Sequence, residues 1–229
     1  MSKKAVILLS GGLDSTTTLY YAKKKRYKCF CLIFDYGQRH KKEIKSAVKI
    51  AKLLKCEYKI IKIKMPWSKS ALTDRKIKVP IRRDIKKMKK EIPSTYVPAR
   101  NTIFLGFAVS YAESIGADSI FIGANALDYS GYPDCRPNFY KAYKKVIGLG
   151  TKAGVKGRKI KIITPLINKT KAEIVKMGMK LRVPYYLTWS CYKGGAKPCG
   201  KCDSCLLRAK GFYEALKKQE VLCRSHGKY

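Results

Sequence analysis

Acidic side chains are scarce in this chain of 229 residues, which has 15 Asp and Glu against 51 Lys and Arg. The resulting net charge of +36 predicts self-repulsion at low ionic strength and affinity for polyanions such as RNA or nucleotide phosphates. A coat of solvated lysines, as in proteins from a salty or hot cytoplasm, is the alternative interpretation. Heat-adapted proteins normally gain Glu along with Lys, and Glu is rare here.

Long hydrophobic runs are also lacking. No stretch reaches the roughly 18 apolar residues that span a membrane, and the apolar run at 102–112 is interrupted by Gly106 and Ser110. The apolar run at 5–9 is too short for a signal peptide. Apolar residues make up 46% of the chain and aromatic residues 11%, which excludes a disordered protein. We expect a soluble, cytoplasmic, globular protein.

Short β-rich runs alternate with helical patterns, which is typical of an α/β fold with a doubly wound parallel sheet. Thr170 and Glu173 form a capping box at the start of one helix, and Gly116 is the predicted stop of another. The five predicted strands are 5–9, 29–34, 58–63, 119–123 and 159–163. Besides the helix that begins directly after the first loop, the sequence predicts helices at 44–54, 103–115, 170–179 and 206–216.

The chain divides into a large and a small predicted part. Residues 1–184 form the predicted main domain, with an irregular lid at 64–98 where four prolines interrupt any regular pattern. Residues 185–229 form a metal-tied C-terminal region that holds five of the nine cysteines, four of them close together in the sequence. An odd number of cysteines without a secretory context favours metal ligation over a disulfide framework.

The strongest single motif is the run S-G-G-L-D-S at 10–15, directly after the first strand and at the start of a helix. Two glycines let the backbone approach an anion, and the hydroxyl groups and free N–H groups of the helix start point at it. The run lacks the Lys of the G-x-x-x-x-G-K-[ST] loop, so it is not built to pull on a γ-phosphate. A tight turn capped by Ser15 is the structural alternative. The predicted phosphate cradle comprises Leu9, Ser10, Gly11, Gly12, Leu13, Asp14, Ser15, Thr16, Thr17, Thr18 and Leu19.

A polar run at 35–40 follows the second strand. Ligands of open α/β sheets gather beyond the carboxyl ends of the strands, so we expect Gln38, Arg39 and His40 to line the same crevice as the phosphate loop. A lone His such as His40 is more often a capping or surface residue than a catalyst.

A second polar run, at 96–101, precedes a predicted helix that starts near Thr102. Asn101 is the predicted N-cap of this helix. Arg100 then faces the crevice, where its fork of N–H donors suits a phosphate or a carboxylate and stays charged at pH 7.

Four cysteines near the C-terminus have the spacing C-x7-C-x2-C-x2-C, with Gly200 allowing a tight turn between ligands. Four thiolates at this spacing can close a tetrahedral site around Zn²⁺ and leave no open position for catalysis. Iron–sulfur ligation and free thiols are the alternatives. The predicted metal ligands are Cys191, Cys199, Cys202 and Cys205.

The loop at 10–15 resembles the pyrophosphate loop of the N-type ATP pyrophosphatases, which activate a substrate oxygen as an adenylate and release pyrophosphate. The run D-Y-S-G-Y-P-D-C-R-P at 128–137 is more specific. Together with D-Y-G-Q-R-H, V-P-A-R-N and the cysteine cluster, it makes nearly the whole chain similar to the 7-cyano-7-deazaguanine synthase family. One departure is Ala99, where that family often has Gly.

This resemblance implies a Rossmann-like, adenine nucleotide α-hydrolase-like fold, ATP with Mg²⁺, and a structural Zn²⁺. It implies that 7-carboxy-7-deazaguanine and ammonia become 7-cyano-7-deazaguanine (preQ0), a precursor of queuosine or archaeosine, through an adenylated carboxylate and an adenylated amide. Asp14 is a candidate to help hold Mg²⁺, or only to stabilise the positive end of a helix.

Substrate contacts follow from the same resemblance. A deazaguanine presents N–H donors, for which the carboxylate of Asp128 or Asp134 is a good acceptor, while Tyr129 or Tyr132 would stack on the ring. Arg136 would hold the reacting carboxylate or the α-phosphate. The alternative is that either Asp only caps a turn.

Two rival functions remain. A tRNA-modifying ATP pyrophosphatase of the thiolation or lysidine type would suit the positive charge, but 229 residues leave no room for an appended RNA-binding domain. A zinc-ribbon nucleic-acid binder would leave the runs at 10–15 and 128–136 unexplained. We expect small-molecule substrates and no membrane, and a homodimer and RNA binding remain open.

Overall fold

A computed structural model describes residues 3–84, 91–127 and 131–225, with side chains described as far as residue 217. Its centre is a five-stranded sheet in the order β3-β2-β1-β4-β5, in which every neighbouring pair is parallel. The predicted doubly wound α/β fold is confirmed, and each strand begins and ends within two residues of its prediction. The strands are β1 (Lys4–Leu8), β2 (Lys28–Asp35), β3 (Glu57–Lys62), β4 (Ser119–Ile122) and β5 (Lys161–Ile163).

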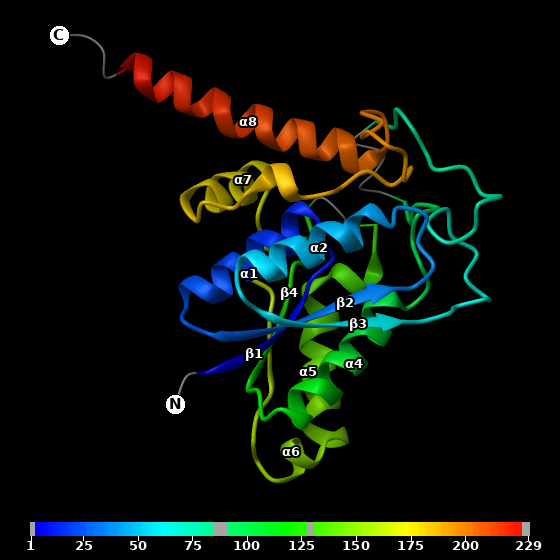
Figure 1. Cartoon of the computed structure of the whole chain (residues 1–229), viewed down its shortest axis with the longest axis vertical. Coiled ribbons are helices and arrows are strands. Elements are labelled where there is room, and N and C mark those ends of the chain that lie inside the picture. Colours follow the sequence, from blue (N-terminus) through cyan, green and yellow to red (C-terminus); the bar gives the residue numbers. More distant parts are fainter. Residues whose placement is uncertain (1–2, 85–90, 128–130, 226–229) are drawn as a thin grey trace.

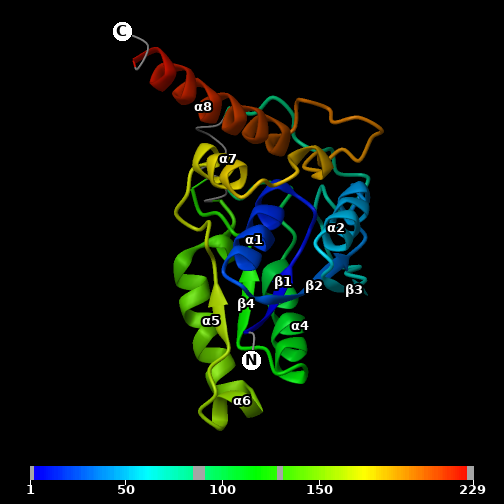
Figure 2. The ribbon, with the colours of Figure 1, turned by 60° about the vertical axis from the view of Figure 1, so that its left-hand side comes forward.

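Helices cover both faces of the sheet in stacked layers, with a further pair of helices outside one of them (Figures 1 and 2). The first layer holds α1 (Leu13–Lys24) and α2 (Lys42–Leu53), and the opposite layer holds α4 (Arg100–Ser114) and α5 (Pro137–Gly150). The other elements are α6 (Lys152–Val155), α7 (Lys171–Lys180), α8 (Asp203–Ser225) and the short 3₁₀ turns η1 (Pro133–Cys135) and η2 (Tyr185–Leu187).

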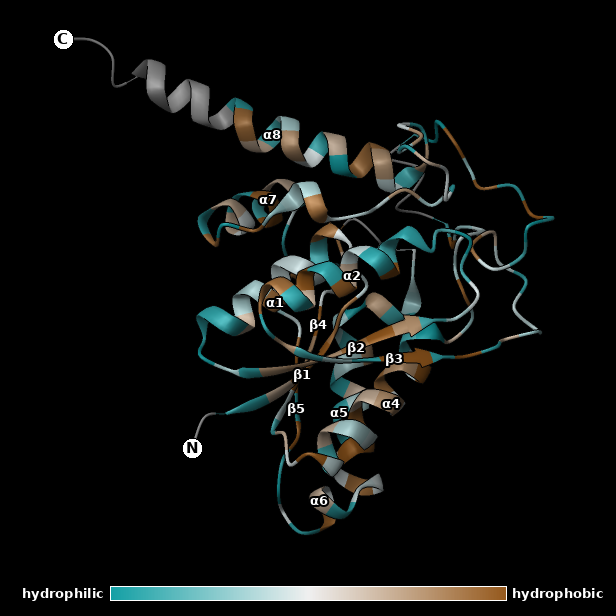
Figure 3. Cartoon of the chain, viewed as in Figure 1, coloured by the Kyte–Doolittle hydropathy of each residue, from teal (hydrophilic) through white to brown (hydrophobic). Residues whose placement is uncertain are grey.

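The two layers are built from alternate residues of the central strands. Ala5 and Ile7 of β1 pack with α1 and α2, whereas Val6 and Leu8 pack with α4 and α5. Successive side chains of a strand point to opposite faces, so a strand covered on both sides is apolar throughout. The hydrophobic residues accordingly concentrate along the strands at the centre of the molecule (Figure 3).

The last helix is longer than its prediction at 206–216. Helix α8 begins at Asp203, between two of the predicted metal ligands, and continues to Ser225. The prediction was wrong in length because it followed the apolar stripe alone, whereas residues 217–222 contain no Gly or Pro to end a helix. Gly211 lies against α7, where an added Cβ would come within 2.3 Å of the Lys171 side chain.

The start of α4 corrects a second prediction. Asn101 is not the N-cap, because that position belongs to Ala99, which has a left-handed backbone with φ of 53°. Helix α4 therefore begins at Arg100, and Asn101 is buried inside its first turn. The capping box at Thr170 is as predicted, and so is the end of α4 before Gly116, which has φ of 66°.

The predicted lid at 64–98 contains no regular helix or strand in its described residues, 64–84 and 91–98. It is tied to the rest of the protein: Arg39 donates to the carbonyl oxygens of Asp74 and Ile77, and Ile81 forms a bridge with Cys202. Among the described residues, no helix combines the length and the apolar content needed to cross a membrane.

Candidate active site

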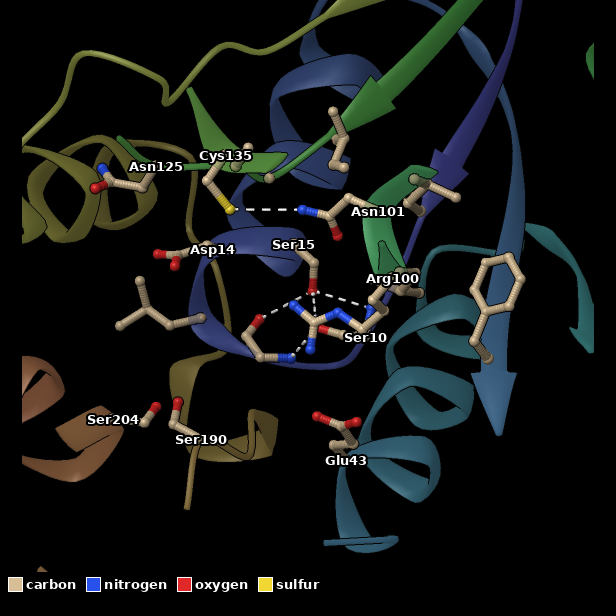
Figure 4. Close-up of a pocket in the computed structure, with 18 of the residues that line it drawn as sticks. Ser10, Asp14, Ser15, Glu43, Arg100, Asn101, Asn125, Cys135, Ser190 and Ser204 are labelled. Carbon is tan, nitrogen blue, oxygen red and sulfur yellow. Dashed lines mark hydrogen bonds between the residues drawn. The ribbon is translucent and has the colours of Figure 1, made fainter. Parts of the chain in front are cut away.

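One cavity lies beyond the carboxyl ends of β1, β2 and β4, where Leu8, Phe34 and Ile122 form part of its wall (Figure 4). The chain runs from β1 outward to β3 in one direction and then returns to place β4 on the other side of β1. Such a switch point between strands is where open α/β sheets bind their ligands. The cavity is the candidate active site.

The loop between β1 and α1 is wedged between two other elements. Gly11 has φ of +81°, and an added Cβ would lie 2.3 Å from the carbonyl oxygen of Glu43. On the other side, a Cβ on Gly123 would lie 2.9 Å from the backbone nitrogen of Ser15. Because neither position accommodates a side chain, the backbone of the loop is held in place by α2 and by the end of β4.

The loop presents hydroxyl and N–H groups to the cavity. Ser10 Oγ and Ser15 Oγ lie 3.0 Å apart, and Gly12 N donates to Ser10 Oγ over 3.3 Å. Helix α1 starts after Gly12, which has no side chain to cap the first N–H groups of the helix. These donors and the positive end of α1 give the cavity the character of an anion site.

The predicted phosphate cradle divides into two groups. Thr16 Oγ1 donates to the Gly12 carbonyl and Thr17 Oγ1 to the Leu13 carbonyl, so these hydroxyl groups serve the helix itself. Gly11, Thr16, Thr17, Thr18 and Leu19 are not among the residues that line the cavity. Those that line it are Leu9, Ser10, Gly12, Leu13, Asp14 and Ser15.

Lys171 was missed by sequence analysis. It is the first residue of α7 and is only 6% exposed, and its Nζ lies 2.8 Å from both carboxylate oxygens of Asp14. Both residues line the cavity. The phosphate loop has no Lys of its own, but the fold supplies one from 157 residues further along the chain.

Arg100 faces the cavity as predicted, at the first position of α4. Its Nη1 donates to Tyr36 Oη over 3.3 Å. Burial works to lower the pKa of Arg100, but the neighbouring Tyr36 and Asp134 raise it above its usual value, so the guanidinium stays charged. Burial also raises the pKa of Tyr36 to about 12, so its hydroxyl stays protonated.

The run at 128–137 is only partly brought to the cavity. Asp128 and Tyr129 lie outside the described residues. Tyr132 lines the cavity, and its hydroxyl lies 2.6 Å from Thr95 Oγ1. Asp134 and Arg136 are not among the lining residues.

Asp134 instead holds the start of α4. Its Oδ2 accepts from the backbone N–H of Asn101 over 3.1 Å, and its carbonyl accepts from the Asn101 side chain. The carboxylate thus satisfies a free donor at the helix N-terminus. Arg136 is exposed, while Cys135 lines the cavity and burial raises the pKa of its thiol to about 12.

Of the three crevice residues predicted at 38–40, only His40 lines the cavity. Gln38 is fully buried, and its amide bonds the backbone of Phe34 and the carboxylate of Glu43. Arg39 bonds the segment 74–77 instead. His40 Nε2 lies 3.2 Å from Glu43 Oε2, and Glu43, which sequence analysis missed, also lines the cavity.

The four predicted metal ligands come together. The Sγ atoms of Cys191, Cys199, Cys202 and Cys205 all lie within 4.8 Å of one another, so the cluster could bind a metal ion. Backbone N–H groups donate to two of these sulfurs: Cys199 N to Cys191 Sγ over 3.3 Å, and Cys202 N to Cys199 Sγ over 3.3 Å. Such donors stabilise thiolates.

The cysteine cluster and the cavity share a wall. Ser190 and Tyr192, on either side of Cys191, line the cavity, as does Ser204 between Cys202 and Cys205. Sequence analysis missed these residues, and also two more lining side chains from the same region, Trp189 and Arg208.

Two residues, Trp189 and Arg208, hold this wall in place through hydrogen bonds. Trp189 N donates to the carbonyl of Gly11 in the phosphate loop over 3.0 Å. Arg208 Nη1 donates to Thr188 Oγ1 over 2.7 Å and to Ser190 Oγ over 3.2 Å. The wall contributed by the cysteine cluster is therefore bonded directly to the phosphate loop.

Comparison with known proteins finds one family that matches almost the full length of the chain. The family model of the queuosine biosynthesis protein QueC matches residues 4–216. The chain belongs to the QueC family. It is 58% identical over 216 residues to the 7-cyano-7-deazaguanine synthase of Thermoplasma volcanium, a match that covers 94% of this chain and 88% of that protein. It is 57% identical to the same enzyme of Acetivibrio thermocellus, over 93% of this chain and 94% of that one.

Similarity to solved structures is more remote. The NMN synthetase of Francisella tularensis is 16% identical, with a TM-score of 0.48, over 87% of this chain and 71% of that protein.

Proposed function

We propose that this member of the QueC family is a 7-cyano-7-deazaguanine synthase, an ATP-dependent ligase that joins ammonia to 7-carboxy-7-deazaguanine and carries the product on to the nitrile. The observation that carries the proposal is identity of 57 to 58% to enzymes of that name over nearly the whole chain. The cavity supports it, because it combines an anion-binding loop with Arg100 and Lys171.

The first half of the reaction needs an activated carboxylate. A carboxylate oxygen attacks the α-phosphorus of ATP, pyrophosphate leaves, and ammonia then displaces AMP from the acyl adenylate to give the amide. The loop at 10–15 would hold the leaving pyrophosphate through its N–H and hydroxyl groups. Arg100 and Lys171 would offset the negative charges that must approach each other.

The second half removes an oxygen atom from the amide. The amide oxygen attacks the α-phosphorus of a second ATP, pyrophosphate leaves again, and loss of AMP and of both protons of the amide nitrogen yields the nitrile. The same donors serve both halves, because each places one oxygen nucleophile and one triphosphate in the same cavity.

Contacts to the base are assigned here to three groups. Asp128 remains the predicted acceptor for the N–H donors of the deazaguanine, since the carboxylate of Asp134 is engaged at the start of α4. Tyr132, which lines the cavity, is the stacking candidate. Tyr129 remains a prediction of the same kind.

Mg²⁺ would enter with the phosphates of ATP, neutralising charge as pyrophosphate departs. Asp14 does not offer it a free carboxylate, because Lys171 bonds both oxygens. We therefore assign no residue of the chain to Mg²⁺.

Zn²⁺ is the metal that we propose for the cysteine cluster. A tetrahedron with Zn–S bonds of about 2.3 Å has sulfur–sulfur edges of about 3.8 Å, which agrees with four sulfurs within 4.8 Å. An iron–sulfur cluster divides the four thiolates between two irons or among four, and so spreads the sulfurs further apart than a single ion does. The ion would supply structural cross-linking, with Cys191, Cys199, Cys202 and Cys205 as its ligands.

We also propose that residues 1–184 form one domain, with a lid at 64–98, and that residues 185–229 form a region tied together by the metal. A reducing compartment such as the cytoplasm would keep the thiols available for metal. A homodimer remains a prediction.

The discriminating experiment measures which substrate stimulates ATP cleavage. With ammonium and ATP present, we expect 7-carboxy-7-deazaguanine to stimulate release of AMP and pyrophosphate, and unmodified tRNA to have no such effect. Stimulation by tRNA alone would favour the tRNA-modifying alternative. Release of ADP and orthophosphate would contradict the pyrophosphatase chemistry.

A further inference from the structure

The surface formed by α5, α6 and β5 is basic and carries no acid of its own. Between Asp134 and Glu173 the sequence has eleven Lys and Arg and no Asp or Glu. These elements form the end of the molecule opposite to α8 (Figure 1). The basic face, as we define it, consists of eight exposed side chains: Lys141, Lys144, Lys145, Lys152, Lys156, Arg158, Lys159 and Lys161.

Acids of neighbouring elements do not neutralise this face. Glu113 of α4 accepts from the backbone nitrogen of Ala153 over 2.6 Å, and Asp118 accepts from Ser119 Oγ over 2.7 Å. Within the described part of the chain, no salt bridge involves a residue of the basic face. The mutual repulsion of these cations is therefore left for an external anion to relieve.

The basic face surrounds a hollow. Lys144, Arg158, Lys159 and Lys161 line it together with glycines of α5 and of the turn after α6. An added Cβ on Gly148 or Gly157 would meet nothing within 4 Å, whereas one on Gly154 would lie 2.3 Å from the carbonyl oxygen of Gly148, so the hollow is open at the first two glycines. A backbone phosphate could thus approach between the cationic side chains.

Apolar side chains stand beside the cations. Leu149 is 83% exposed, Val155 77% and Val146 58%. Figure 3 shows hydrophobic and hydrophilic residues alternating along α5 and α6. A ligand that suits this surface combines negative charge with apolar groups.

We propose that the basic face binds single-stranded RNA. Lys and Arg would contact successive phosphates, and the exposed apolar side chains would pack against unpaired bases, which a duplex keeps inside. An anionic membrane also attracts lysines, but its flat surface does not enter a hollow. Helix α5 of 14 residues spans about 21 Å, so this site lies well away from the catalytic cavity, where Cys135 precedes the other end of the helix.

The test uses the full-length protein and a fluorescein-labelled single-stranded RNA of about 20 nucleotides, with Kd measured by fluorescence anisotropy at several salt concentrations. One variant carries K144Q, K145Q, K156Q and K159Q on the basic face. The matched control carries K45Q, K49Q, K52Q and K55Q on and just after α2, so that both variants lose four exposed cations.

The proposal predicts that the basic-face variant binds RNA at least about tenfold more weakly and that its slope of log K against log salt falls by about 3, as expected for four lost contacts to a single strand. The control variant should stay within about threefold of the parent. Equal losses in the two variants would overturn the proposal, as would absence of RNA binding by the parent.

A second pair of variants changes the hollow without removing a lysine. Gly148→Glu places a negative charge there and Gly148→Gln a neutral side chain of similar size, both into open space. We expect Gly148→Glu to weaken RNA binding several-fold more than Gly148→Gln, with the same thermal stability. Identical affinities for the pair, or binding to vesicles of phosphatidylserine and phosphatidylcholine in preference to RNA, would overturn the proposal.

Discussion

Replacing Lys171 with Met tests whether the phosphate loop depends on the cation that α7 supplies. The Lys171 and Asp14 side chains are 7% and 19% exposed, and Nζ lies 2.8 Å from both carboxylate oxygens. Removing one partner of a buried pair costs about 3 to 5 kcal/mol, and we expect about 3 kcal/mol because the Asp14 carboxylate remains partly solvated. For a chain of this size that lowers Tm by about 6 to 12 °C.

The same change should weaken ATP binding. Without Lys171, the negative charge of the Asp14 carboxylate is left beside the triphosphate, and the triphosphate also loses a cation that faces it. We expect at least a tenfold increase in the Kd for ATP, or about 1.4 kcal/mol, measured by titration calorimetry. Asp14→Asn combined with Lys171→Met removes both charges, so it should recover most of the Tm but only part of the ATP affinity.

These two variants separate structure from function. A Lys171→Met protein with unchanged Tm and unchanged ATP affinity would show that the ion pair contributes neither to stability nor to phosphate binding. A lower Tm with unchanged ATP affinity would show that the ion pair only joins α7 to the loop, and that Lys171 has no role at the phosphates.

Three further predictions concern other parts of the site. Ala99→Gly should stabilise the protein by about 0.5 kcal/mol, because removing the strain of the left-handed backbone at Ala99 outweighs the conformational entropy that Gly adds to the unfolded chain. A lower Tm would contradict this prediction. In a Trp67→Phe background, which leaves Trp189 as the only tryptophan, Cys199→Ser should abolish metal binding, shift the fluorescence of Trp189 and weaken ATP binding, because Trp189 bonds both Cys191 and the phosphate loop. An unchanged fluorescence spectrum would argue against a wall shared by the cysteine cluster and the cavity. Burial raises the pKa of the Cys135 thiol to about 12, so the thiol stays neutral at pH 8 and should react with iodoacetamide far more slowly than free N-acetylcysteine does. Mass spectrometry of the modified peptide measures the rate, and equal rates would contradict the burial of Cys135.

The sheet was predictable because strands covered on both faces are short apolar runs bounded by Gly and polar residues. The strand Lys4–Leu8, followed after two residues by Gly11 and Gly12, is the clearest case. The metal ligands were predictable for a similar reason, because their spacing is local in the sequence. The start of α4 was not, since nothing local indicates that Ala99 adopts a positive φ while Asp134 caps the helix from 33 residues away.

The walls of the cavity were the least predictable part. Lys171, Trp189 and Arg208 come from segments that lie more than 150 residues beyond the phosphate loop. They reach the cavity because α7 packs against α1, α8 packs against α7, and the segment between these two helices bonds the phosphate loop. Their own surroundings in the sequence indicate only a helix start, a loop and a helix face. Long-range packing decides such positions, and periodicity carries no information about it.

The proposed function requires one cavity to perform two successive adenylations on the same substrate. The most direct test incubates the purified protein with 7-carboxy-7-deazaguanine, ammonium and ATP, and follows the carboxylate, the amide, the nitrile and AMP together by liquid chromatography and mass spectrometry. We expect the nitrile to form with the amide as an intermediate, and two AMP to be released for each nitrile. Accumulation of the amide as the final product with one AMP, or formation of ADP in place of AMP, would contradict it.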